Sequence, residues 1–304
     1  MSVGLQVIEE LIYRYKEGAV IKRTLLCFEF TDSNECFYVE LNRDKCKLVE
    51  NTETYKAKLI TTTTILEELI KGKRKLSTEI NKGGVVFDGD FITVMNVNKY
   101  FNLTPPVMIE KEQPSMIVLL YQWVFLWVVV PIDTSWAAYL SILTIAVMPL
   151  LFYKRRYTIY DRISALCIAV LSLLCLLHVD ATVVICSSLL LLGMMWFASC
   201  FCKFSISSIY TCNNYGGEDA LDNIIFLKLH KNISFAWGVF CIYLATVTYF
   251  LMQTKIAPYT GLINNIWPAL MIAFTFFMLK YYPKSMMNKI VKKNESNHFH
   301  HPFS

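Results

Sequence analysis

The stretch MIVLLYQWVFLWVVV, residues Met116–Val130, decides the fold class of this 304-residue chain. It belongs to a run without charged side chains, Gln113–Ile132, which at the rise of an α-helix is long enough to cross a bilayer. Five more charge-free runs follow: Thr134–Tyr153, Ile163–Val179, Ala181–Cys202, Asn232–Thr254 and Ile256–Leu279. One run of this kind would also suit a buried helix of a soluble protein. Six in succession predict an all-α membrane domain of six transmembrane helices over residues 116–282.

Composition and charge distribution place the chain among membrane proteins rather than nucleic-acid-binding proteins. Hydrophobic residues make up 55% of the chain and aromatic residues 14%, more than a soluble globular protein usually contains. The net charge is +5, but residues 1–112 are nearly balanced, with 16 basic and 17 acidic side chains. The basic surplus therefore lies between and after the apolar runs, where it marks the cytoplasmic side of a membrane. We expect no nucleic-acid partner.

The basic residues also predict the orientation of the chain. Residues 1–18 predict a helix and lack the features of a secretory signal, so the first domain should stay in the cytoplasm. With that placement, one basic residue of the membrane half, Lys255, lies outside, and twelve lie inside. The twelve are Lys154, Arg155, Arg156, Arg162, Lys203, Lys228, Lys231, Lys280, Lys284, Lys289, Lys292 and Lys293. We expect a multi-pass membrane protein with both termini cytoplasmic and a basic cytoplasmic tail over residues 283–304.

The part before the membrane half predicts a small α+β domain over residues 1–101. Apolar and polar side chains alternate in four segments, as they do in half-buried strands. These segments are Thr24–Thr31, Cys36–Leu41, Lys45–Val49 and Tyr55–Thr62. Short turns such as Asp32-Ser33-Asn34 join them, which predicts an antiparallel meander.

Further elements are expected to cover the apolar face of this sheet. Thr64–Lys71 predicts a helix that ends at Gly72, and Gly83–Asp90 predicts a fifth strand. Phe91–Phe101 then predicts a second covering helix. Because one face of the sheet is apolar and must be buried, we expect a five-stranded sheet with two helices packed on that face.

Two short motifs stand within this order of elements. Gly89-Asp90 ends a strand just before the last helix, and Leu69–Lys73 ends the preceding helix. Together with the element order over residues 20–101, they make this segment similar to the sterol carrier protein type-two lipid-transfer family. The resemblance implies a hydrophobic tunnel between sheet and helices that holds a sterol, a fatty acyl chain or an isoprenoid.

The apolar pattern permits such a tunnel without requiring it. Aromatic rings and a flexible thioether that face one interior suit an adaptable apolar site, but they also suit a filled core. From the sequence alone both interpretations stay open. The nine candidate ligand-binding residues are Phe28, Phe30, Phe37, Leu59, Leu69, Ile70, Phe87, Phe91 and Met95.

A linker joins the two halves. Residues 102–115 contain Pro105, Pro106 and Pro114, which disfavour regular structure and predict a short, semi-rigid spacer. The spacer should hold the first domain close to the membrane.

A long loop between apolar runs, Lys203–Lys231, predicts an amphipathic helix from Glu218 onward. Its apolar stripe consists of Leu221, Ile224, Ile225, Phe226 and Leu229. The helix can lie at the membrane interface, pack under the first domain or serve as an ordinary connection. If it packs under the first domain, we expect it to touch the mouth of the pocket or the domain face beside it.

The ten cysteines are expected to stay reduced. Cys27, Cys36 and Cys46 belong to a domain without an export signal, and most of the others lie in apolar runs, where cysteine acts as a small apolar residue. We expect no disulfide framework and no metal site.

No motif predicts catalysis or a cofactor. The cores of the apolar runs lack ionisable carriers for protons or ions, and the chain lacks HExxH, GxSxG and P-loop sequences. We therefore expect a non-enzymatic, membrane-tethered protein that binds or transfers lipid, with a lipid or other apolar molecule and the bilayer as partners. Two alternatives stay open: an integral-membrane enzyme of lipid metabolism whose soluble domain holds the substrate, and a lipid-gated transporter or sensor. The sequence does not define the oligomeric state.

Overall fold

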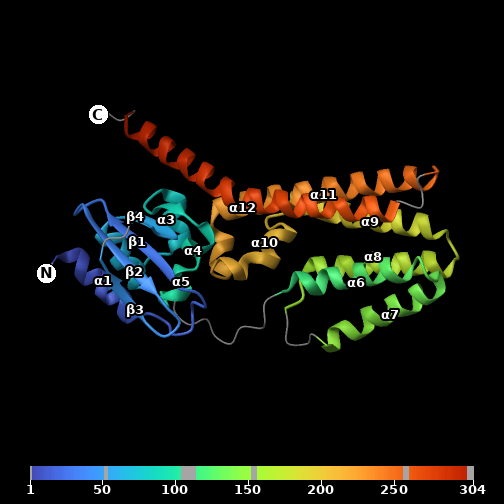
Figure 1. The fold of residues 1–304 in the computed structure, drawn as a ribbon, viewed down its shortest axis with the longest axis horizontal. Helices are drawn as coiled ribbons and strands as arrows, with labels where there is room; N and C mark the ends of the chain where they lie inside the picture. The colour runs from blue at the N-terminus through green and yellow to red at the C-terminus, as the bar shows by residue number, and fades with distance from the viewer. Residues whose placement is uncertain (1, 51–53, 104–113, 152–155, 256–259, 300–304) are drawn as a thin grey trace. The chain divides into compact units, whose positions relative to one another are not determined.

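The computed structural model of the chain describes residues 2–50, 54–103, 114–151, 156–255 and 260–299 (Figure 1). The chain divides into two compact units, and neither is a single stretch of sequence. The first unit combines the N-terminal part with Cys212–Leu229 and the stretch from Phe277 onward. The second unit holds the remaining residues of the chain. The predicted boundary at residue 101 therefore does not enclose the whole first unit.

The first unit is built on a five-stranded mixed sheet with the strand order β3-β2-β1-β4-β5. The strands are β1 (Thr24–Phe30), β2 (Glu35–Leu41), β3 (Cys46–Val49), β4 (Ala57–Thr61) and β5 (Val86–Gly89). The first three form the expected antiparallel meander, in which Phe28 of β1 lies opposite Phe37 of β2.

The prediction that all four early strands form one antiparallel meander is wrong for β4. This strand returns to the open edge of β1 and pairs with it in parallel, with Leu26 opposite Ala57 and Phe28 opposite Leu59. The register places apolar residues of both strands on the same face, which is the face that must be buried. Because parallel strands end at the same edge, Asp32 after β1 accepts hydrogen bonds from the backbone N–H and hydroxyl of Thr63, 2.9 and 2.5 Å away.

Five helices belong to the N-terminal part of the described first unit, where two covering helices and a leading helix were predicted. They are α1 (Val3–Tyr13), α2 (Thr63–Ile70), α3 (Leu76–Lys82), α4 (Phe91–Met95) and α5 (Val97–Tyr100). The leading helix ends at Tyr13 rather than Gly18, and the predicted Phe91–Phe101 helix is two short helices that meet at Asn96. Helix α3 was missed because the segment from Arg74 to Lys82 is mostly polar.

The predicted apolar face is the core of the first unit. Leu26, Phe28 and Phe30 of the central strand β1 are fully buried against the helices, as their alternation predicted. Helix α1 contributes Val7, Ile8 and Leu11 to the same cluster. One side of the sheet is therefore covered by helices, while the other side bears Glu29 and Lys58, which form an ion pair.

The other helices of the chain follow the apolar runs. They are α6 (Met116–Val129), α7 (Thr134–Leu151), α8 (Ile159–Leu176), α9 (Ala181–Ser199), α10 (Ile206–Thr211), α11 (Ile224–Met252) and α12 (Thr260–Phe299), with short 3-10 turns at Cys212–Tyr215 and Glu218–Asp222. Each of the six predicted runs overlaps one of these helices. Among the described residues, α8, α9 and α11 are long and apolar enough to cross a membrane. Helices α6 and α7 contribute shorter apolar stretches, Val118–Val129 and Thr134–Val147.

Two tryptophans of the second unit form hydrogen bonds to serines of neighbouring helices. The indole N–H of Trp123 donates to the hydroxyl of Ser164 at 2.7 Å, and that of Trp127 donates to the hydroxyl of Ser188 at 2.7 Å. Helices α9 and α11 approach closely at Gly193, where an added Cβ would lie 2.9 Å from the carbonyl oxygen of Gly238. Small residues at such a crossing are typical of helix packing in membranes.

Replacing Phe28 by Ala should destabilise the first unit by about 3–5 kcal/mol, because the whole ring is buried in the central strand. Tyr13→Ala is the control, since this aromatic side chain is 91% exposed and its loss should change stability by no more than about 0.5 kcal/mol. Pulse proteolysis of the full chain in increasing urea measures both variants. Equal losses of stability in the two variants would contradict the assignment of Phe28 to the core.

Candidate ligand-binding core and its cap

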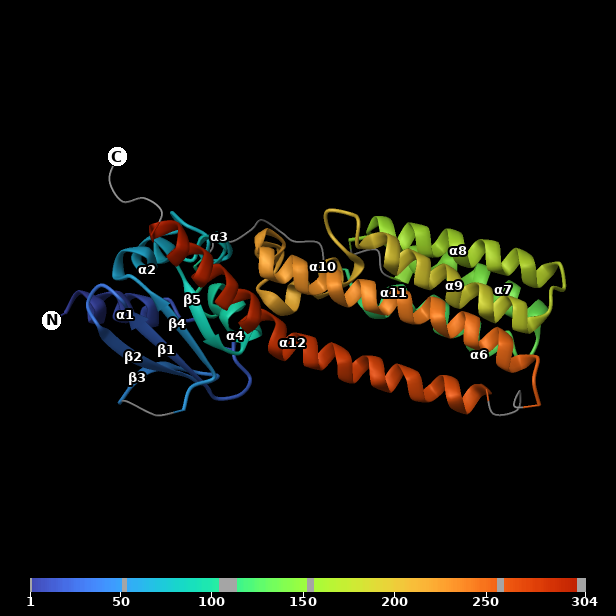
Figure 2. The same ribbon diagram turned by 90° about the horizontal axis from the view of Figure 1, so that it is seen from above.

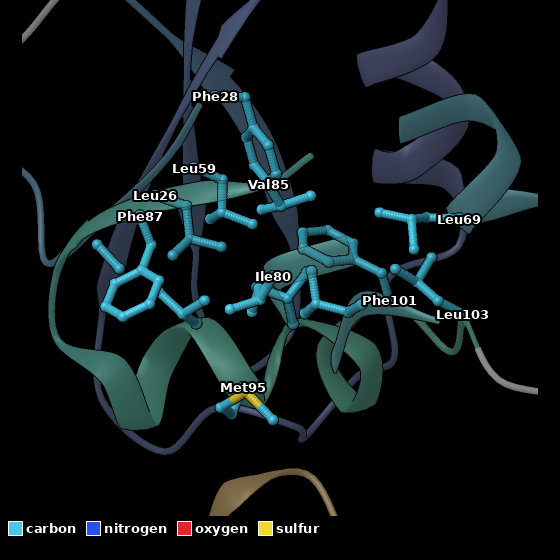
Figure 3. Close-up of a cluster of buried hydrophobic side chains, with 14 of the residues drawn as sticks. Leu26, Phe28, Leu59, Leu69, Ile80, Val85, Phe87, Met95, Phe101 and Leu103 are labelled. Atoms are coloured by element: carbon cyan, nitrogen blue, oxygen red, sulfur yellow. The ribbon is translucent and has the colours of Figure 1, made fainter. Parts of the chain in front are cut away.

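The nine candidate residues lie together in one apolar cluster of the first unit. Eight of them are buried, and Phe37 is half-buried with its ring edge-on to Phe30 at 5.8 Å. Side chains from the strands and from the helices point toward one another in this cluster, with Phe28 and Leu59 on the sheet side and Met95 on the helix side (Figure 3). The structure thus brings all nine candidate residues together.

Sequence reasoning left several residues of the same interior out of the candidate site. Phe101, at the end of α5, is fully buried and contacts Phe28 and Tyr15 with ring centroids 6.5 and 6.1 Å apart. Leu76 and Ile80 of α3 are also buried here. Their spacing of four residues is a helical signal, but two apolar residues in a polar segment are too few to predict a helix.

A segment more than a hundred residues further along the chain closes the helix side of this cluster. We call Cys212–Leu229 the cap segment. Five of its side chains are buried in the same core as the nine candidates: Cys212, Tyr215, Ala220, Ile225 and Phe226. Leu221 and Leu227 are partly buried against it. The structure therefore confirms one of the three alternatives for the loop, packing on the first domain, and its contacts with Phe91 and Met95 reach the candidate residues themselves.

Aromatic rings connect the sheet to the cap segment. Phe87 of β5 lies 5.2 Å from Phe91 of α4, and Phe91 lies 5.9 Å from Tyr215. Tyr215 in turn meets Phe226 edge-on at 5.0 Å. Burial raises the pKa of the Tyr215 hydroxyl above its usual value, with a smaller contribution from Asp90. The four rings form a continuous apolar path from β5 to the first turn of α11.

The helix of the cap segment begins later than predicted. Residues 218–222 form a 3-10 turn, and the α-helix starts at Ile224 rather than at Glu218. The side chain of Asn223 caps it by accepting hydrogen bonds from the backbone N–H groups of Ile225 and Phe226 at 2.9 and 3.0 Å. The amide nitrogen of Asn223 also lies 3.7 Å from the sulfur of Met95. One buried asparagine therefore caps α11 and touches a candidate ligand-binding residue.

Hydrogen bonds to the backbone fasten the cap segment at its edges. The Asn81 side chain donates to the carbonyl of Asp222 at 2.8 Å and accepts from the N–H of Ile224 at 2.9 Å. On the other side, Asn96 donates to the carbonyl of Asn214 at 2.8 Å, and Lys99 donates to that of Asn213 at 2.7 Å. These bonds define the register of the cap on α3, α4 and α5.

Charged groups surround this contact. Lys75 lies 3.2 Å from Asp222 and 4.0 Å from Asp219. Burial raises the pKa of Asp219, although Lys75 opposes the shift. The side chain of Asn98 also donates to Asp219 at 3.4 Å. The interface has an apolar centre and a polar rim, as protein interfaces commonly have.

The last part of α12 also packs on the first unit (Figure 2). Met287 is buried in the apolar cluster, and Lys284 donates a 2.8 Å hydrogen bond to Asp88 of β5. This bond lowers the pKa of Asp88 below its usual value. Asn294 donates to the carbonyl of Lys82 at 3.0 Å. Residues 283–299 of the predicted basic tail thus continue α12, and Met287 among them contributes to the core.

The chemistry offered by this site is apolar contact. Among the described residues, no group of three His, Cys, Asp or Glu side chains is placed to hold a metal ion. The proline linker predicted over residues 102–115 lies mostly outside the described residues, which end at Leu103 and resume at Pro114. A comparison of the chain with models of known protein families gives no match, and neither does a comparison with curated proteins.

Gly216→Ala should weaken the docking of the cap segment more than Gly217→Ala. The two glycines have nearly the same φ angle, +93° and +94°, a region in which alanine is strained at either position. A Cβ at Gly216 would lie 2.4 Å from the carbonyl oxygen of Met95, whereas the nearest atom to a Cβ at Gly217 is a Lys99 carbon at 4.0 Å. The additional cost at Gly216 should be about 1–3 kcal/mol, as for other overpacked contacts.

Hydrogen exchange of the α4 amides in the full-length protein measures this difference. Exchange should be faster in the Gly216 variant than in the Gly217 variant, because only the first pushes the cap away from Met95. Equal protection of α4 in both variants would contradict the contact.

Proposed function

We propose that the protein is a membrane-tethered lipid-binding protein whose first unit holds a sterol, a fatty acyl chain or an isoprenoid. The observation that carries the proposal is the single apolar cluster formed by all nine candidate residues. It occurs in a chain whose described residues include three helices long and apolar enough to cross a membrane. A ligand with only apolar groups needs no charged partner, and adaptable aromatic and thioether side chains suit it.

The order of elements also supports this proposal. The strand β5 ends at Gly89, the helix α4 follows at once, and Asp90 caps it by accepting a 3.1 Å hydrogen bond from the N–H of Thr93. This is the Gly-Asp pair on which the resemblance to the sterol carrier type-two family rests. The pair has a local physical role here, because Gly89 has φ +90° and an added Cβ would lie 2.5 Å from the carbonyl oxygen of Lys56.

The proposed entry route for the ligand is displacement of the cap segment. Tyr215 and Phe226 cover the helix side of the cluster and are held by a polar rim of hydrogen bonds. Partial opening of this rim would expose Phe91 and Met95, where a lipid chain could replace the rings of the cap. Binding would then exchange one set of apolar contacts for another.

The membrane half is proposed to span the bilayer six times, with both termini in the cytoplasm. Helices α8, α9 and α11 supply three spans on length and composition. Helices α6 and α7 and the first part of α12, up to Leu279, are assigned the other three, because each of these stretches lies in a charge-free run of sequence. The basic residues on the cytoplasmic side support this orientation.

A second candidate function, a lipid-gated sensor or transporter, is favoured by one observation. Ile225 and Phe226 belong both to the apolar cluster and to the first turn of α11, which continues to Met252 as one helix. A ligand that moved these two side chains would act directly on a membrane-spanning helix. Binding and signalling are thus compatible uses of the same core.

Photo-crosslinking tests the lipid proposal in the full-length protein. A photoactivatable fatty acid or sterol should label peptides of the first unit saturably, including the cap segment, and an excess of the unmodified lipid should compete. Leu59→Trp should reduce this labelling about tenfold, because the larger side chain fills the centre of the cluster.

Leu11→Trp is the matched control, since Leu11 is also fully buried but lies on α1 outside the nine candidates. Equal effects of the two tryptophans would indicate general damage to the core. Labelling confined to the membrane helices in the wild-type protein would contradict a lipid site in the first unit.

Reporter fusions test the topology. A reporter after Arg156 or at the C-terminus should be active in the cytoplasm, and one after Lys255 should be active outside. Termini on opposite sides of the membrane would overturn the proposal of six spans.

A further inference from the structure

Two cysteine side chains meet on the side of the sheet that faces away from the apolar cluster. Cys27 of β1 and Cys36 of β2 have their sulfur atoms 3.1 Å apart. Cys27 lies between Leu26 and Phe28, which point into the cluster, so the pleat of the strand directs Cys27 to the opposite side. Both cysteines are free thiols.

The strand register explains why these two sulfur atoms meet. Cys27 pairs with Tyr38, and Cys36 pairs with Glu29, so the two cysteines are diagonal neighbours across the antiparallel pair. Such diagonal side chains point to the same face and lie within reach of each other. The connection between the strands is a tight turn in which Asn34 has φ +54°, so the ends of β1 and β2 stay close together.

The two thiols differ in access to solvent. Cys36 is exposed near the start of β2, whereas Cys27 is fully buried. A small reagent in solution therefore meets Cys36 first, and Cys27 is accessible mainly to the sulfur of Cys36. This combination of one exposed and one shielded thiol is suited to a two-step exchange reaction.

We propose that Cys27 and Cys36 form a reversible dithiol–disulfide site that reacts with small disulfides such as oxidised glutathione. A disulfide requires its sulfur atoms about 2.05 Å apart, so the observed pair, at 3.1 Å, needs a closure of about 1 Å. The site is separate from the apolar cluster, and the inference does not depend on the proposed lipid.

The reaction balances in two exchange steps. The Cys36 thiolate attacks one sulfur of oxidised glutathione, and the first glutathione thiolate leaves with formation of a mixed disulfide at Cys36. The Cys27 thiolate then attacks the Cys36 sulfur and expels the second glutathione thiolate. The two protons from the cysteines end on the two reduced glutathione molecules, so that two thiols are oxidised and one disulfide is reduced.

The surroundings of Cys27 make the second step pH-dependent. Burial and then the contact with Cys36 raise the pKa of the Cys27 thiol to about 12, while Lys58 of β4 and Tyr38 of β2 oppose the shift. Tyr55, just before β4, also interacts electrostatically with Cys27. Since little of the Cys27 thiolate is present at neutral pH, ring closure should speed up about tenfold for each unit of pH increase.

Peptide mapping of the full-length protein after treatment with oxidised glutathione tests the proposal. Glutamyl endopeptidase cleaves after Glu29 and Glu35, which separates the two cysteines into different peptides unless a disulfide joins them. The linked pair should appear in the wild-type protein and disappear on reduction. Cys36→Ser should abolish it, whereas Cys46→Ser, at another cysteine of the same sheet, should leave it intact.

A trivalent arsenical provides a second measurement that requires no oxidation. Phenylarsine oxide bridges two neighbouring thiols, so it should bind the wild-type and Cys46→Ser proteins and protect Cys27 and Cys36 together from alkylation. Because Cys36 is exposed, its serine variant should fold normally and lose this joint protection. Accumulation of glutathione on Cys36 with Cys27 still reduced at high pH, or equal arsenical binding by the Cys36→Ser protein, would overturn the proposal.

Discussion

Burial of Tyr215 against Phe91 of α4, with Phe226 packed edge-on to Tyr215, is the contact on which the first unit depends. In the cap segment, Tyr215 contacts the ring of Phe91 and Asn223 contacts the sulfur of Met95, and both of these α4 side chains are buried and apolar. The N-terminal part of the chain therefore does not complete its own core. Its partner is the cap segment, which the chain reaches only after α10.

The apolar centre of this contact contributes more to the free energy of folding than its polar rim does. Burying a large apolar side chain contributes about 1.5–3 kcal/mol, and aromatic pairs add about 0.5–1.5 kcal/mol. An exposed ion pair such as Lys75 with Asp222 contributes only about 0.2–1 kcal/mol. The rings thus supply most of the stability, whereas the bonds made by Asn81 and Asn96 align the segment so that the rings fit.

The same core serves structure and the proposed binding of lipid. A ligand that entered it would compete with the side chains of the cap, and the cap is continuous with α11. If the core held a lipid as proposed, its occupancy would be linked to the position of the first turn of α11 through Ile225 and Phe226. Under this proposal, a cap segment that moved aside would let the fold bind a lipid without a permanently open cavity.

Local patterns in the sequence determined the strands, the apolar runs and all nine residues of the candidate site. Alternation at Leu26, Phe28 and Phe30 was sufficient to assign the buried face of β1, because the direction of a side chain in a strand depends only on its place in the pleat. The charge-free runs were equally easy to recognise, because the absence of charged side chains is a property of each helix by itself. The segment that forms α3 had only two apolar residues, so its helix was not predicted.

Only the tertiary structure decided which distant parts of the chain meet. The parallel pairing of β4 with β1, the docking of the cap segment and the burial of Met287 all join residues far apart in sequence. The contact of Cys27 with Cys36 depends on a strand register that neither cysteine reveals by itself. Periodicity shows which side of an element must be buried. The partner that buries it is selected by the shape and free energy of the whole fold, for which a single segment carries no local signal.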